Sequence, residues 1–234
     1  MSLDLGNVVW KREDESAGPD VMSRRAYISA VTGFTVYGVV LASIIAYLCM
    51  SWRPTSIIPV LVIGLVIPII GVVIAVKSEQ WLVSLFGYTL VVVGLGVLLG
   101  PTVAMYKFAV VMTAFAATAG VTVVMSVVGI LIPKSLEHWG GYLFAALLAF
   151  LFVRIGQSFM IGMGVPPTTW YMPIIEYAGA IIFSLYIIYD WNRAVNLPHT
   201  LDNAIDCAMA IFLDIINLFI IILRALGSRS SSSD

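Results

Sequence analysis

Charged residues are scarce in this sequence. Aspartate, glutamate, lysine and arginine make up 11% of the 234 residues, against roughly 25% in a typical soluble domain. Hydrophobic residues reach 61%, and the mean hydropathy is +1.03. A surface with so few charges would not stay hydrated, so the composition excludes an ordinary soluble globular protein and indicates a membrane protein.

Features of several other protein classes are also missing. The net charge is -1, which leaves no basic footprint for nucleic acid. Because the two cysteines, Cys49 and Cys207, lie near apolar segments, we expect buried thiols rather than a disulfide or a metal site. The two histidines fall in connecting segments, the HExxH zinc motif is absent, and no lysine follows Lys134 to hold retinal. We therefore expect no enzymatic activity and no cofactor.

Long apolar runs, in contrast, are abundant. A helix needs about 20 apolar residues to cross the hydrocarbon of a bilayer. Seven segments meet this length, at 26–52, 57–76, 81–99, 108–132, 139–160, 174–195 and 201–224. The sequence predicts an all-α, polytopic membrane protein whose seven transmembrane helices form one domain, 26–224. A polar N-terminal tail, 1–25, and a Ser-rich C-terminal tail, 225–234, flank it.

Small residues and prolines suggest how these helices pack. The segment GYTLVVVGLGVLLGP (87–101) carries four glycines that would permit close approach of neighbouring helices. Pro59 and Pro68 are expected to bend the second helix. Lysine and arginine are slightly more frequent in the segments that face inside if the N-terminus is cytoplasmic, and we adopt that orientation.

Two aspartates interrupt the last two apolar runs. Asp190 lies in FSLYIIYDWN (183–192), and Asp214 lies in FLDIINLFI (212–220). A charged side chain at mid-membrane costs at least ~2.5–3.5 kcal/mol, so it normally faces protein or water and has a function. Exposure at the end of a helix is the alternative for Asp190, whereas Asp214 is too deep in its segment for that.

Helical geometry groups these acids with other side chains. At about 100° per residue, the last segment carries a polar stripe on one face: Asn203, Asp206, Asp214 and Asn217. One face of the preceding segment carries Glu176, Gly179, Phe183, Tyr186 and Asp190. Lipid would not face such a stripe, so we expect the two faces to meet. The pore-lining candidates are Asn203, Asp206, Asn217, Tyr186 and Glu176.

Spacing along the chain does not by itself bring Asp190 and Asp214 together. If NLPHT is the whole turn, their depths differ by on the order of 13 Å, at ~1.5 Å per residue. A stretch 201–206 lying partly in the membrane interface, with Asp202 and Asp206, would make the depths equal.

The region 183–227, with FSLYIIYDWN and AIFLDIINLFIIILRALG, resembles the Bax inhibitor-1 family of membrane proteins, especially its bacterial branch. The segment 87–101 is a weaker second match. The resemblance implies a seven-helix protein of the bacterial plasma membrane that leaks calcium ions in a pH-sensitive way. It also implies a hydrogen-bonded pair of aspartates near the cytoplasmic side, here Asp190 with Asp214, whose protonation controls opening.

Two basic residues are candidates for a latch or counter-ion. In the family, a basic residue between the second and third helices can latch onto the aspartate pair, and Lys77 holds that place here. A lysine lacks the two-pronged grip of arginine on a carboxylate, which weakens this inference. Arg154, in the fifth segment, is the other candidate, and snorkelling of its guanidinium to the membrane surface is the alternative.

The pair has a simple electrostatic logic. Two carboxylates ~4 Å apart repel by roughly 4 kcal/mol at an effective dielectric of 20, so the pair keeps one shared proton near neutral pH. That proton forms a hydrogen bond between the last two helices, and its loss favours separation and a cation path. A tight calcium site needs about six to eight oxygens, so we expect only weak, transient calcium at Asp190 and Asp214.

Two other functions remain open. A proton-coupled transporter would also place acids inside the membrane, and it would show saturable, substrate-dependent flux. A non-conducting protein that regulates partner membrane proteins would be inert in liposomes. The expected partners are the lipid bilayer, calcium ions and protons, with membrane protein partners unidentified.

Overall fold

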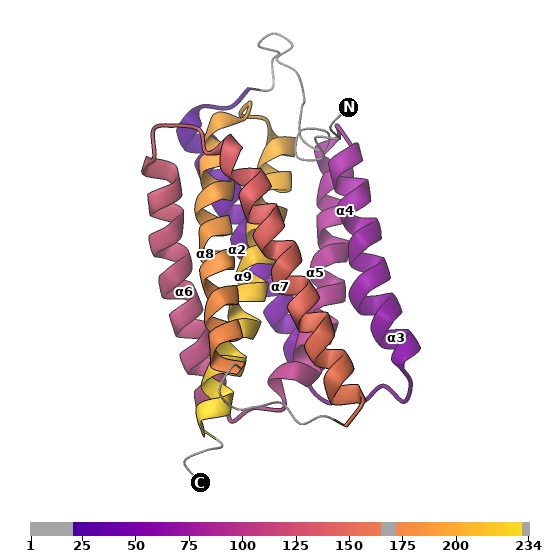
Figure 1. Cartoon of the computed structure of the whole chain (residues 1–234). Helices are drawn as coiled ribbons and strands as arrows, with labels where there is room; N and C mark the ends of the chain where they lie inside the picture. Colours follow the sequence, from indigo (N-terminus) through magenta and orange to yellow (C-terminus); the bar gives the residue numbers. More distant parts are fainter. Residues whose placement is uncertain (1–20, 165–171, 231–234) are drawn as a thin grey trace, which may run out of the picture. The chain divides into compact units, whose positions relative to one another are not determined.

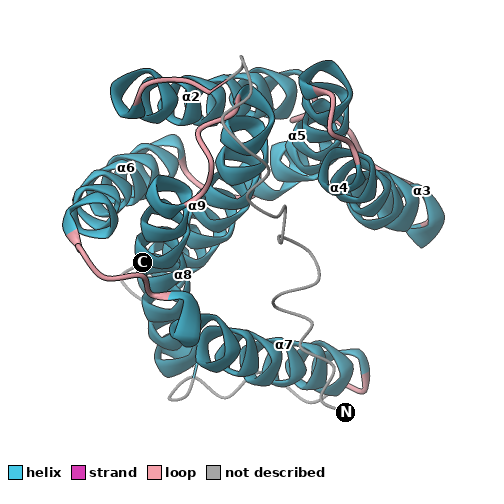
Figure 2. Ribbon diagram, turned by 90° about the horizontal axis from the view of Figure 1, so that it is seen from above, coloured by secondary structure: helices cyan, strands magenta, loops and turns pink. Residues whose placement is uncertain are grey.

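The computed structural model describes residues 21–164 and 172–230, and within those ranges all regular structure is helical (Figures 1 and 2). The elements are α2 (Arg24–Leu48), α3 (Ile57–Leu61), the π-helix η1 (Val62–Val66), α4 (Ile67–Lys77), α5 (Trp81–Val103), α6 (Phe108–Leu131), the short 3-10 helix η2 (Glu137–Trp139), α7 (Gly140–Gly162), α8 (Met172–Asn196) and α9 (Leu201–Ser230). Residues 1–20 of the predicted N-terminal tail and 231–234 of the C-terminal tail lie outside the described residues.

Seven helices in the described part of the chain are long and apolar enough to cross a membrane, which confirms the predicted fold class. Their ends differ from the predicted spans by a few residues. The first span ends at Leu48 rather than at 52, because residues 49–51 form a turn. The last helix runs on to Ser230, so the part of the predicted tail from 225 to 230 is helical instead.

The second span is one continuous path of three pieces, α3, η1 and α4. The π-helical segment η1 ends one residue before α4, and Pro68 occupies the first turn of α4. Proline cannot donate a backbone hydrogen bond, and its ring crowds the carbonyl four residues earlier, which is Gly64. A π-turn before the proline relieves that conflict. The structure thus has a π-segment ahead of Pro68, and the bend expected from Pro59 and Pro68 stays a prediction.

The chain divides into two compact units, and the predicted single domain 26–224 stays a prediction. The first contains the described residues up to Lys107 together with Ala194–Phe212, and the second contains Phe108–Arg193 and the described residues from Leu213 on. Helix α9 therefore contributes its first part to one unit and its remainder to the other.

The first unit packs α5 closely against α4 and α2. A side-chain carbon added to Gly87 of α5 would lie 2.5 Å from the carbonyl oxygen of Gly71, and one added to Gly71 would lie 2.5 Å from that of Gly87. Gly100 is similarly close to the carbonyl oxygen of Ala46 in α2. Such contact with backbone is possible only without a β-carbon, so the prediction of glycine-mediated packing is confirmed.

Substitution of Gly87 by alanine is expected to lower the melting temperature of the purified protein. The added methyl group meets a backbone carbonyl, which cannot rotate away, and overpacking of this kind costs about 1–3 kcal/mol. A β-carbon added to Gly120 in α6, by contrast, would meet nothing within 4 Å. Gly120→Ala is therefore the matched control, and it should leave the melting temperature unchanged or raise it slightly. Equal shifts for the two variants would contradict the packing described for Gly87.

The second unit is organised around α8. Gly129 of α6 lies against the backbone of Ile188, and Gly179 of α8 lies against Phe150 of α7. Asn192, which is 1% exposed, accepts a hydrogen bond from the backbone N–H of Leu136 at 2.8 Å. Its amide nitrogen donates to the carbonyl oxygens of Ile132 and Lys134. One buried asparagine thus fastens the connection between α6 and η2 to α8.

Candidate functional site

Asp190 and Asp214 are both buried inside membrane-spanning helices of the second unit. Asp190 lies in α8 with an exposed fraction of 8%, and Asp214 lies in α9 with 7%. Apolar residues surround each acid along its own helix and favour burial in the hydrocarbon region. The alternative of an exposed end position for Asp190 does not hold, since its side chain is covered.

The two carboxyl groups lie close enough to interact with each other electrostatically and through a side-chain hydrogen bond. A carboxylate can only accept a hydrogen bond, so a direct bond between two carboxyl groups requires one proton between them. The structure therefore brings together the two residues that the sequence singled out, and their role in gating stays a prediction.

The groups around the pair come largely from α8. Tyr186, one turn before Asp190, is close enough to interact electrostatically with both carboxyl groups. Arg193 and Tyr189 interact in the same way with Asp190. Rings follow one another along this helix, from Phe183 to Tyr186 and on to Tyr189, with successive centroids 6.4 Å apart. The pair thus lies beside one cation and two phenols rather than in a purely apolar pocket.

The predicted polar stripe on α9 is turned away from lipid. Asn203, Asp206 and Asp214 are 7%, 4% and 7% exposed, and Asn217 is half-buried, with its amide donating to the carbonyl oxygen of Leu213. Within its most apolar stretch, α9 is 72% buried, against 6% for α7. A helix this well covered can carry polar side chains that a lipid-facing helix could not.

The position of 201–206 relative to the membrane interface stays a prediction. These residues form the first turns of α9, which begins at Leu201, and both Asp202 and Asp206 are buried. In the first unit, the hydroxyl of Ser84 in α5 donates a 2.5 Å hydrogen bond to Asp202. Sequence reasoning did not single out Ser84. A hydroxyl within an apolar segment was the only signal available.

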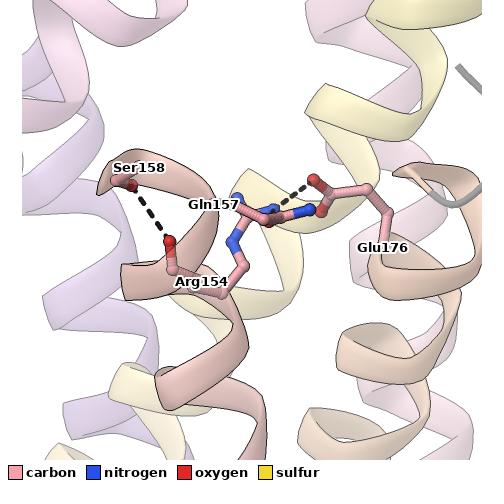
Figure 3. A network of polar contacts seen from close by, with 4 residues as sticks. All are labelled: Arg154, Gln157, Ser158 and Glu176. Carbon is pink, nitrogen blue, oxygen red and sulfur yellow. Dashed lines mark hydrogen bonds and ion pairs between the residues drawn. The ribbon is translucent and has the colours of Figure 1, made fainter. Parts of the chain in front are cut away.

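Arg154 and Glu176 form an ion pair that sequence reasoning also missed. The Nη1 atom of Arg154 in α7 lies 2.7 Å from Oε1 of Glu176 in α8, and both side chains are largely covered (Figure 3). The same nitrogen lies 3.4 Å from Oε1 of Gln157. Arg154 therefore has a partner within the protein, and Glu176, a predicted pore-lining residue, is that partner.

Lys77 is the last residue of α4 and is exposed. It belongs to the first unit, whereas Asp190 and Asp214 belong to the second. Its role as a latch stays a prediction. Tyr186, Asn203, Asp206 and Asn217 likewise stay candidates for lining a path, with the burial given above.

Comparisons with known proteins match this chain to one family model and to several bacterial and yeast proteins. A family model described as "Inhibitor of apoptosis-promoting Bax1" matches residues 24–231. An uncharacterized protein of Helicobacter pylori is 35% identical over 144 residues, which are 62% of this chain, and the chain spans only 57% of that relative's length. The inner membrane protein YbhL of Escherichia coli is 25% identical over 222 residues, covering 88% of this chain and 92% of YbhL. Bax inhibitor 1 of Saccharomyces cerevisiae is 28% identical over 115 residues, or 46% of this chain and 38% of the yeast protein.

Proposed function

The chain belongs to the Bax inhibitor family of membrane proteins, and on that premise we propose that it is a channel through which calcium ions leak down their gradient. The path opens when the Asp190–Asp214 pair loses its shared proton and closes when the proton returns. The observation that carries this proposal is that two buried carboxyl groups, one on α8 and one on α9, lie within interaction distance of each other.

The pair acts as a clasp between α8 and α9. With one proton, the two carboxyl groups attract each other and hold the helices together. Without it, two negative charges face each other in a medium of low dielectric constant, where their repulsion is several times larger than in water. Separation of the helices relieves the repulsion and lets water and cations reach the carboxylates.

One cation and two phenols surround the pair. Arg193 lies close enough to interact electrostatically with Asp190, and the phenols of Tyr186 and Tyr189 are also near. Loss of the single proton responds to rising pH, so the proposed channel opens as the cytoplasmic pH rises.

The location follows from the same premise. We place the channel in the bacterial plasma membrane with its N-terminus in the cytoplasm. The description of YbhL as an inner membrane protein and the modest excess of Lys and Arg on the predicted inner side support this placement. Asp190 then lies near the cytoplasmic end of α8, and Asp214 lies near the middle of α9.

Calcium flux into liposomes tests the proposal. The purified protein is reconstituted into liposomes that enclose a calcium indicator, and flux is compared between about pH 6 and about pH 8. Flux should rise with pH, at most about tenfold per pH unit because one proton is released. It should also increase in proportion to the calcium gradient without saturating at low concentration.

Other outcomes would favour the alternatives. Flux that saturates and that carries protons with a second substrate would indicate a proton-coupled transporter. Liposomes that remain as tight as protein-free ones at every pH would contradict a channel and favour a non-conducting partner of other membrane proteins.

A further inference from the structure

The ion pair between α7 and α8 is held by a single contact. Only Nη1 of Arg154 reaches Glu176, whereas an arginine that binds a carboxylate strongly uses two parallel N–H groups (Figure 3). Arg154 also lies over the ring of Phe150, 5.9 Å from its centre. Because a single contact holds the guanidinium to the carboxylate, another cation could displace it.

Glu176 has a second oxygen atom that the ion pair leaves unused. Oε2 is buried and has no hydrogen-bond partner among the described residues, and the glutamate as a whole is 7% exposed. Buried carboxylate oxygens in proteins are nearly always satisfied by a donor or a cation. A negatively charged oxygen that is buried and unpaired marks a place where a cation would be stabilised.

This glutamate lies on the same face of α8 as the aspartate pair. Glu176 and Asp190 are separated by four turns, which at ~1.5 Å per residue places them about 21 Å apart along the helix. Gly179, Phe183 and Tyr186 lie between them on that face. The two acidic positions are therefore near opposite ends of one membrane-spanning helix, as the two ends of a cation path would be.

We propose that Glu176 is a second, weak site for divalent cations at the end of α8 remote from the aspartate pair, and that Arg154 is its built-in competitor. The guanidinium occupies the carboxylate in the resting state, and a calcium ion enters by displacing it, with Gln157 as a further oxygen ligand. This inference rests on the proposed function, because it supplies the other end of the same path.

The charges of Arg154 and Glu176 predict that replacing one residue raises calcium flux and replacing the other lowers it. Arg154→Gln removes the competing cation and leaves a negative carboxylate that attracts calcium. Glu176→Gln leaves an unpaired positive guanidinium that repels calcium. The double variant, R154Q with E176Q, has neither charge. An ion pair that only fastened α7 to α8 would instead give losses of the same sign for both single variants.

The test compares these variants by calcium flux in liposomes at about pH 8, where the aspartate pair is open. Flux should rise by about two- to fivefold in R154Q, the factor expected for release of one partly exposed ion pair. It should fall below wild type in E176Q and lie between the two in the double variant. Near pH 6 every variant should be as slow as wild type, because the aspartate pair is closed. Arg53→Gln, at an exposed arginine in the loop before α3, is the control and should not change flux.

A second measurement is independent of flux. The melting temperature of purified R154Q in detergent should rise on addition of millimolar CaCl2, whereas that of wild type and of the double variant should rise less. Parallel losses of flux in both single variants, or equal stabilisation of all three proteins by calcium, would overturn the Glu176 site. If the wild-type protein carries no calcium at any pH, the proposed channel function fails, and the melting experiment still decides whether Glu176 binds the ion.

Discussion

Replacement of Asp214 by asparagine is expected to make calcium flux low and independent of pH. The asparagine amide always carries hydrogens, so it can donate to the carboxylate of Asp190 at every pH and mimics the protonated pair. Wild type, by contrast, should gain flux by up to about tenfold per pH unit through the titration. The measurement is flux into liposomes across a series of pH values, with Asp190→Asn tested alongside.

Asp202→Asn is the matched control for this experiment. Asp202 is also a buried aspartate on α9, and its carboxylate accepts a hydrogen bond from the hydroxyl of Ser84. Its asparagine variant should keep the pH dependence of wild type. If D190N and D214N behave like D202N, with pH dependence intact, the clasp does not control the channel.

Replacement of Asn192 by alanine is expected to lower the stability of the protein strongly. The backbone N–H of Leu136 and the carbonyl oxygens of Ile132 and Lys134 would lose their buried partner together. The buried N–H of Leu136 costs about 1–3 kcal/mol when it is left without a partner, and the two part-buried carbonyl oxygens add to this, so the total is about 3 kcal/mol. For a chain of this length that corresponds to a fall in melting temperature of roughly 6–12 °C.

Asn196→Ala is the comparison variant, since Asn196 lies one turn further along α8 and is exposed. Thermal unfolding of the two purified variants in the same detergent gives the answer. The shift for N192A should be several times that for N196A. Shifts of similar size would mean that the connection between α6 and η2 does not depend on Asn192.

The seven spans could be predicted because a bilayer places a simple demand on length and hydropathy. Their ends were less predictable, because the backbone can continue a helix wherever its hydrogen bonds are satisfied, as α9 does through Gly227 to Ser230. The prolines of the second span predicted a bend, but they did not predict the π-segment before Pro68. A proline in the sequence shows that one backbone hydrogen bond of the helix is missing, but it does not show how the backbone compensates for the loss.

The acidic pair was predictable in identity but not in contact. The energy of a charge in hydrocarbon singles out Asp190 and Asp214 from the sequence alone. Counting residues from the turn placed them at different depths, and equal depths required the stretch 201–206 to lie partly in the membrane interface. Pairing depends on how α8 and α9 cross and rotate, and the sequence contains no direct measure of either.

The Arg154–Glu176 ion pair could have been predicted from the positions of the two charges in the sequence. Glu176 is an acid in the first turns of α8, and Arg154 is the basic residue of α7 nearest to that end. Consecutive antiparallel helices bring the end of one beside the start of the next, so opposite charges there favour a pair. The contact between Ser84 and Asp202 has no comparable signal, because it joins residues 118 positions apart.

Infrared difference spectroscopy of the purified protein gives the most direct view of the proton between Asp190 and Asp214. The carbonyl stretch of a protonated carboxylic acid should disappear as pH rises, over the same interval in which calcium flux increases. That pH-sensitive band should be missing from both D190N and D214N and present in D202N. A band that stays constant while flux changes, or that titrates normally in both asparagine variants, would contradict a channel held shut by a shared proton.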